Sequence, residues 1–154
     1  MDTKLWVKGQ QDRLTKEITA LEKQVAGTAK PAAAASIQQA IAERGAISAL
    51  LTQALEAGYT DIGCGMVYKS TGRRVLSVEV ALPTCGCPAK ETQEQSTLVY
   101  ETDNAALVWR VRCCANHVED ANDRVGAEHD KWIDGLAEKA RVARKTRKAV
   151  EQTR

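Results

Sequence analysis

The chain has 154 residues and a net charge of +2, with 44% hydrophobic and 27% charged residues. This size is typical of one domain, or of one small domain with an extended helical part, and excludes most large enzyme architectures. The composition is that of a folded protein and excludes a disordered tail. No segment has the unbroken apolar length of a membrane span, and the first residues lack the apolar stretch of a secretory signal. We therefore expect a cytoplasmic protein without membrane association.

The first segment, residues 1–27, has the apolar spacing of a helix that pairs with another helix. A seven-residue alternation of apolar side chains is typical of a coiled coil, and it comprises Val7, Leu14, Ile18, Leu21 and Val25. Gly27 is placed to cap the end of this helix. We expect the stripe to be an interface, either with the final helix of the same chain or with a second copy in a homodimer.

A linker and a second helix are predicted next. Residues 28–35 are expected to form the linker, because Pro31 interrupts a helix that would continue through it. Ser36 and Gln39 have the spacing of a capping box, so the second helix is expected to begin at Ser36 and to end at Gly58. Its apolar stripe is too wide for a solvated helix, and the helix must therefore pack on a substantial surface.

After Gly58 the apolar residues recur at every second position, which predicts four strands. The strands are expected near residues 66–69, 75–82, 98–100 and 107–113. Turn sequences at Ser70–Gly72 and at Thr102–Asn104 separate neighbouring strands. The simplest topology is a four-stranded antiparallel meander with one apolar face covered by a helix.

The last segment is predicted to be a long helix that begins at Asn116, a good N-cap residue. The predicted fold class is α+β, with a coiled-coil-like N-terminal helix, a second helix, the meander and this long C-terminal helix. Residues 36–154 are expected to form one α+β domain that ends in a basic helix.

Five cysteines are present, and an odd number in a chain without a secretory signal argues against a disulfide framework. In an up-down-up-down meander, the starts of the first and third strands and the ends of the second and fourth lie at one edge of the sheet. We expect five thiols to converge there, from Cys64, Cys85, Cys87, Cys113 and Cys114.

His117 follows Cys114 by three residues and is expected to face the same thiols. Thiolate and imidazole are ligands that Zn²⁺ prefers, so the sequence predicts a zinc site. The expected ligands are Cys85, Cys87, one of Cys113 or Cys114, and either Cys64 or His117.

Two other interpretations of the thiols stay open. One is that they are inert apolar side chains, because Cys113 continues the buried face of the fourth strand. The other is thiol-based catalysis, in which the helix N-terminus activates Cys114 and His117 acts as its base. The sequence has none of the common enzyme motifs, such as a phosphate-cradling glycine-rich loop or a His-Glu-x-x-His helix. A non-enzymatic protein is therefore expected.

The C-terminal segment is strongly basic. Between Lys131 and Arg154 there are four lysines and four arginines but three acidic residues, which gives a charge of +5 and leaves −3 for the rest. Four of these cations fall on one face of a helix, and they are Arg141, Arg144, Lys145 and Lys148. The face is interpreted as a solvated helix end, a nucleic-acid-binding surface, or a surface for an acidic protein partner or a membrane.

Taken together, these patterns predict a small interaction or regulatory protein, of the accessory type, that binds a macromolecular partner. A protein partner is the leading expectation. Zinc would hold the end of the sheet and the final helix together. Nucleic-acid binding by the basic C-terminal helix is the first alternative, and a thiol enzyme is the second.

Overall fold

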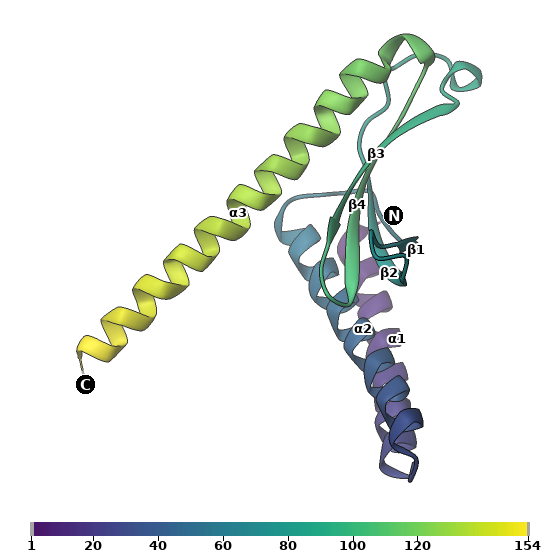
Figure 1. Cartoon of the computed structure of the whole chain (residues 1–154). Helices are drawn as coiled ribbons and strands as arrows, with labels where there is room; N and C mark the ends of the chain where they lie inside the picture. Colours follow the sequence, from purple (N-terminus) through teal and green to yellow (C-terminus); the bar gives the residue numbers. More distant parts are fainter. Residues whose placement is uncertain (1, 154) are drawn as a thin grey trace. The chain divides into compact units, whose positions relative to one another are not determined.

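The computed structural model of the protein describes residues 2–153. It has the predicted α+β class, with two helices, four strands and a long last helix in chain order (Figure 1). These elements are α1 (Thr3–Ala26), α2 (Pro31–Glu56), β1 (Ile62–Tyr68), β2 (Arg74–Ala81), β3 (Glu94–Glu101), β4 (Ala105–Cys113) and α3 (Val118–Gln152). Two short 3₁₀ helices, η1 (Ala89–Glu91) and η2 (Ala115–His117), precede β3 and α3.

The strands form one mixed sheet in the order β1-β2-β4-β3, so the predicted antiparallel meander is wrong. β1 and β2 pair antiparallel, with Ile62 opposite Val80, whereas β2 and β4 pair parallel, with Val78 beside Leu107. β4 is central because every residue from Ala105 to Trp109 is buried. A strand without an exposed face is most stable between two neighbours.

The chain divides into two compact units. The first comprises the residues up to Pro83 together with Val99–Arg110, and the second comprises Thr84–Leu98 together with the residues from Val111 onward. In the first unit α1 packs along α2, and α2 contacts β2. The second unit contains most of β3, the end of β4 and all of α3.

The apolar stripe of α1 has a different cover from the expected ones. Val7 and Leu14 are buried, and the helix that packs along α1 is α2 of the same chain. A short connection makes two consecutive helices neighbours, and this physical reason favours α2 as the cover. The other predicted interface residues, Ile18, Leu21 and Val25, are half-buried. The structure does not show a coiled coil, and the homodimer stays a prediction.

The start of α2 was placed too late by the sequence pattern. α2 begins at Pro31, so the connection shortens to Thr28–Lys30. Proline is favoured at the first helical position because the N–H that it lacks would have no acceptor there. The capping box does not form, since Ser36 lies inside α2 and its hydroxyl donates to the carbonyl oxygen of Ala32 at 3.3 Å.

Two other boundaries differ from the prediction. β1 begins at Ile62, which places Cys64 inside the strand rather than before it. The glycines on either side of Cys64 have no side chain and hide the apolar alternation by which a strand is recognised. Asn116 lies in η2 and is not an N-cap, because α3 begins at Val118 after His117.

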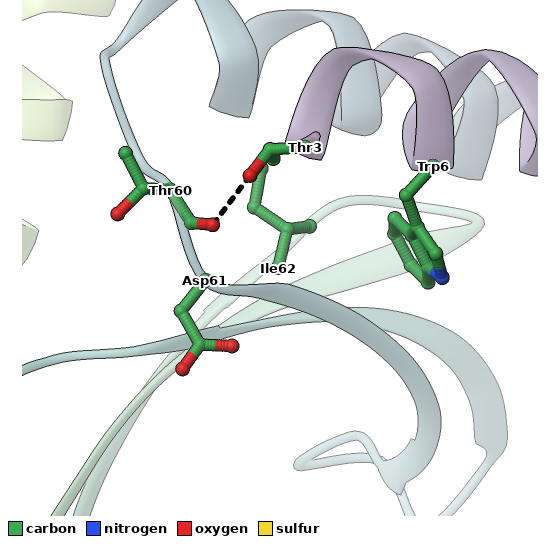
Figure 2. A pocket seen from close by; sticks show the side chains of 5 residues that line it. All are labelled: Thr3, Trp6, Thr60, Asp61 and Ile62. Atoms are coloured by element: carbon green, nitrogen blue, oxygen red, sulfur yellow. Dashed lines mark hydrogen bonds between the residues drawn. The ribbon is translucent and has the colours of Figure 1, made fainter. Parts of the chain in front are cut away.

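Hydrogen bonds fix the connection between α2 and β1. The indole Nε1 of Trp109 donates to the hydroxyl of Tyr59 at 2.8 Å, and the hydroxyl of Thr3 donates to the carbonyl oxygen of Thr60 at 2.6 Å. A pocket of about 140 Å³ lies beside this second bond, lined by Thr3, Trp6, Thr60, Asp61 and Ile62 (Figure 2). The bonds join the start of α1 and the centre of β4 to the same short segment.

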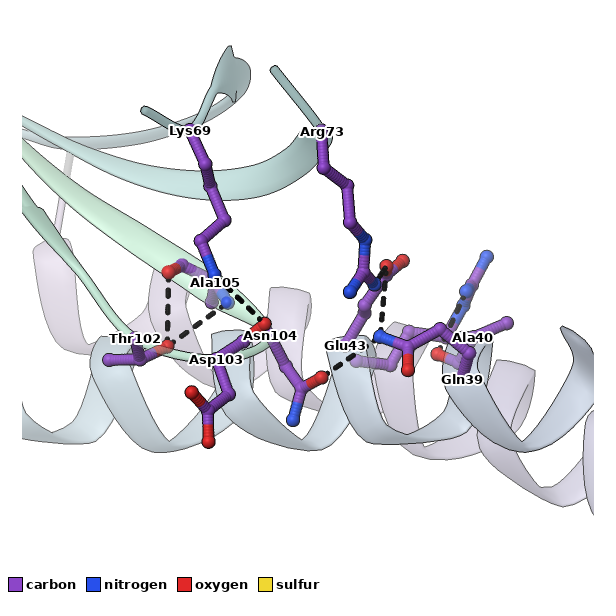
Figure 3. Close-up of polar contacts among 10 residues, drawn as sticks. Gln39, Ala40, Glu43, Lys69, Arg73, Thr102, Asp103, Asn104 and Ala105 are labelled. Atoms are coloured by element: carbon purple, nitrogen blue, oxygen red, sulfur yellow. Dashed lines mark hydrogen bonds and ion pairs between the residues drawn. The ribbon is translucent and has the colours of Figure 1, made fainter. Parts of the chain in front are cut away.

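The turns of the sheet are joined to α2 by polar contacts (Figure 3). Gln39 donates through Nε2 to Oδ1 of Asn104 at 2.9 Å, in the turn between β3 and β4. Glu43 forms an ion pair with Arg73, in the turn between β1 and β2. These contacts hold both hairpin turns against one helix.

The burial of each leucine in the first unit predicts how much its substitution lowers the free energy of unfolding. Leu51 is 0% exposed, and its truncation in Leu51→Ala leaves a cavity, so we expect a loss of about 2–5 kcal/mol in the free energy of unfolding. Leu5 is 68% exposed, and Leu5→Ala should change that free energy by less than about 0.5 kcal/mol. Urea unfolding of both variants measures the difference, and equal losses would contradict the proposed core.

Candidate metal centre

Three cysteines and one histidine of the second unit bring their ligand atoms together. The three Sγ atoms and a ring nitrogen all lie within 4.8 Å of one another, and they belong to Cys85, Cys87, Cys114 and His117. None of the four side chains is fully exposed, and Cys114 is 6% exposed. We call this set the Cys₃His cluster.

Local backbone turns bring the ligands together in two pairs, Cys85 with Cys87 and Cys114 with His117. Gly86 has a φ of +83°, in the left-handed region that a side chain disfavours, and it lies between Cys85 and Cys87. Cys114 follows the end of β4, and η2 then folds back so that the backbone N–H of His117 donates to the Cys114 carbonyl oxygen at 3.0 Å. A tight turn therefore carries each pair.

Two of the distances within the cluster are close to those of a tetrahedral zinc site. Sγ of Cys87 lies 3.6 Å from Sγ of Cys114 and 3.5 Å from Nδ1 of His117. Around Zn²⁺ with ordinary bond lengths, two sulfur ligands lie about 3.8 Å apart, and a sulfur and a nitrogen lie about 3.5 Å apart. Sγ of Cys114 and Nδ1 of His117 are closer, at 2.8 Å, as in a thiol–imidazole hydrogen bond.

Hydrogen bonds within the cluster give the thiols of Cys85 and Cys87 different pKa values. Backbone N–H groups of Cys114 and Cys87 donate to Cys85 and lower the pKa of its thiol to about 6. Hydrogen bonds to Cys85 and Cys114 raise the pKa of Cys87 to about 12, because they favour its protonated form. At neutral pH the metal-free cluster therefore holds a thiolate at Cys85. Thiolates are the form that binds metal.

The other two cysteines are not part of the cluster. Cys113 ends β4, is 0% exposed, and has a pKa raised by burial. Cys113 is the last residue of β4, whereas Cys114 follows the strand and precedes η2. Cys64 lies opposite Val78 within β1, and burial raises its pKa as well. The structure therefore groups three of the five thiols with His117, and the convergence of all five stays a prediction.

A pocket of about 360 Å³ opens beside the cluster and was not predicted from the sequence. It is lined by Thr84, Cys85, Val111, Cys113, His117, Asp120, Ala121 and Arg124. Asp120 and Arg124 follow His117 by three and seven residues. This helical spacing is the sequence feature that predicts a shared face for the three residues. The pocket reaches two of the cluster residues, Cys85 and His117, but Cys114 does not line it.

The four predicted nucleic-acid-binding residues lie together on the second half of α3. All four are exposed, and they line one shallow groove. Both guanidinium contacts of Arg141 go to the carboxylate of Glu138, at 2.5 and 3.0 Å. The geometry of the face is thus as the helical spacing predicts, while its ligand stays a prediction.

Comparisons with known proteins add no family to this description. No protein-family model, no curated protein and no solved structure matches the chain. Among the described helices, none combines the length and the apolar character that crossing a bilayer requires. Function must therefore be argued from the Cys₃His cluster and from the surface of α3.

The lowered pKa of Cys85 leads to a prediction for the metal-free protein. At neutral pH, iodoacetamide should alkylate Cys85 faster than Cys87, because a pKa of about 6 leaves Cys85 as the thiolate while a pKa of about 12 keeps Cys87 protonated. The Cys85 rate should fall as the pH decreases through about 6. Peptide mass spectrometry after brief labelling measures both rates. Buried Cys113 is the internal control, and equal rates at Cys85 and Cys87 would contradict the prediction.

Proposed function

We propose that the chain is a small, non-enzymatic binding protein in which a zinc ion stabilises the second unit. The Cys₃His cluster is the single observation that carries this proposal, because it places four ligand atoms within 4.8 Å. The partner is a macromolecule that contacts α3.

The donor set favours zinc over other metals. Three thiolates with one imidazole are a common ligand set of structural zinc sites, whereas Ca²⁺ and Mg²⁺ prefer oxygen ligands. Four protein ligands complete a tetrahedral shell and leave no position for a substrate. A structural role therefore fits better than a catalytic one.

Bound zinc would supply a cross-link between three segments of the second unit. Cys85 and Cys87 belong to the loop after β2, Cys114 follows β4, and His117 precedes α3. Only three residues of α3 are buried, and these are Ala121, Val125 and Trp132. A small apolar core of this kind is typically supplemented by a metal or by disulfides. The four ligands would hold the start of α3 against the end of the sheet.

Thiol catalysis is the second candidate, favoured by the 2.8 Å contact between Cys114 and His117. A nucleophilic thiol must also be reached by a substrate. Cys114 is 6% exposed and does not line the neighbouring pocket, although His117 does. The geometry supports metal binding more strongly than catalysis.

Binding of a macromolecular partner is supported by the surface of α3. Every described residue of the helix from Ala137 onward is exposed. This segment lacks the tertiary packing that supplies most of the stability of helices in proteins. A partner that covers part of this surface would stabilise it.

Metal stoichiometry tests the proposed site. Protein purified without chelator should contain one zinc ion per chain, and Cys64→Ser should retain it because Cys64 is outside the cluster. Cys114→Ser removes one of four ligands and should lower the zinc affinity at least about 10-fold. Native mass spectrometry, with Co²⁺ absorption as a second readout, measures the loss. Folded wild-type protein that binds neither ion would overturn the proposal.

Removal of the metal should loosen one unit and leave the other unchanged. After chelation, amide hydrogen exchange should increase in η2 and in the first turns of α3, because their cross-link to the loop after β2 is lost. Exchange in α2 should stay constant, since that helix belongs to the first unit. Hydrogen exchange mass spectrometry compares the two regions. Identical exchange with and without zinc would show that the ion has no structural role.

A further inference from the structure

The second half of α3 carries four neighbouring cations, which we call the cationic stripe. It consists of Arg141, Arg144, Lys145 and Lys148, and these four side chains alone line a groove of about 240 Å³. The stripe extends over eight residues of the helix, or about 10 Å at 1.5 Å per residue. Its side chains are all exposed.

The charge of the stripe is only partly neutralised within the chain. Glu138 binds Arg141, and this ion pair lowers the pKa of the Glu138 carboxyl and raises that of Arg141. Among the residues that the structure describes, none forms an ion pair with Arg144, Lys145 or Lys148. Three neighbouring cations are thus available to an external anion.

We propose that the cationic stripe binds the phosphate backbone of a nucleic-acid duplex. This inference rests on the proposed function, because it names the macromolecular partner that α3 contacts. Over about 10 Å of its axis, a duplex presents about six phosphate charges. Arg144, Lys145 and Lys148 would each neutralise one of these phosphates.

The lining of the groove argues against the other anionic partners. A protein partner usually needs an apolar pocket for an anchoring side chain, and no apolar residue lines this groove. A membrane-surface helix needs large apolar side chains on its other face. No aromatic residue and no leucine occurs after Leu136. Because aromatic side chains are also the platforms on which single-stranded bases stack, a duplex fits better than a single strand.

Binding of a fluorescent DNA duplex, followed by anisotropy on the full zinc-loaded chain, tests the inference. The affinity should fall about 40-fold between about 50 mM and about 200 mM salt, as expected for three phosphate contacts. The variant Arg144→Gln, Lys145→Gln, Lys148→Gln removes these contacts and should lose at least about 10-fold in affinity at low salt.

A matched control separates the stripe from the general charge of the helix. The variant Arg124→Gln, Lys131→Gln, Lys139→Gln removes the same charge from the part of α3 that precedes the stripe, and it should lose less than about 3-fold. Equal losses in the two variants would overturn the inference. The inference would also be overturned if the wild-type protein does not bind the duplex at low salt, or if it binds phosphatidylserine vesicles instead of DNA.

Zinc content, measured on the same samples, distinguishes the failure of this inference from that of the proposed function. Protein that holds one zinc ion and does not bind the duplex overturns the nucleic-acid assignment only. Folded protein that binds no zinc overturns the proposed metal-stabilised function, whatever its affinity for DNA.

Discussion

The parallel pairing of β2 with β4 is the constraint on which the candidate metal centre depends. Parallel neighbours end at the same edge of a sheet, and just beyond β2 the N–H of Leu82 still donates to the carbonyl oxygen of Arg110 at 2.9 Å. The two segments that leave this edge carry Cys85 with Cys87 and Cys114 with His117. Ligands almost 30 residues apart in the sequence are brought together because two strands have the same direction.

This constraint explains why the sequence could predict the cluster although it gave the wrong sheet. Turn sequences determine that the chain reverses after each strand, and a meander and the observed sheet agree on every strand direction. They differ in whether β3 or β4 lies beside β2. Local periodicity does not indicate which strand of the β3–β4 hairpin pairs with β2. Only the complete burial of Ala105–Trp109 favours β4 at the centre of the sheet. The metal prediction needed the directions alone.

The predicted element boundaries also differ from the structure at positions where the local sequence pattern is uninformative. The glycines beside Cys64 hide the alternation, so the pattern does not include Cys64 in β1. Pro31 is the first residue of α2, a position where proline is favoured, whereas the pattern alone indicates a helix breaker. The α1 stripe shows that a face is apolar but not what covers it. Its buried residues, Val7 and Leu14, lie in the half of α1 that accompanies the buried end of α2, and the remaining stripe residues are half-buried.

The two halves of α3 connect the cluster with the cationic stripe. α3 has 35 residues, or about 52 Å of continuous helix, and its buried side chains all lie between Ala121 and Trp132. Arg141 follows His117 by 24 residues, about 36 Å along the axis. Because a continuous helix is stiff, the orientation of its first turn determines the direction of the whole helix. An ion that holds His117 would therefore orient the cationic stripe without contacting it. In this arrangement the metal would act on binding through the geometry of the helix rather than through any contact with the partner.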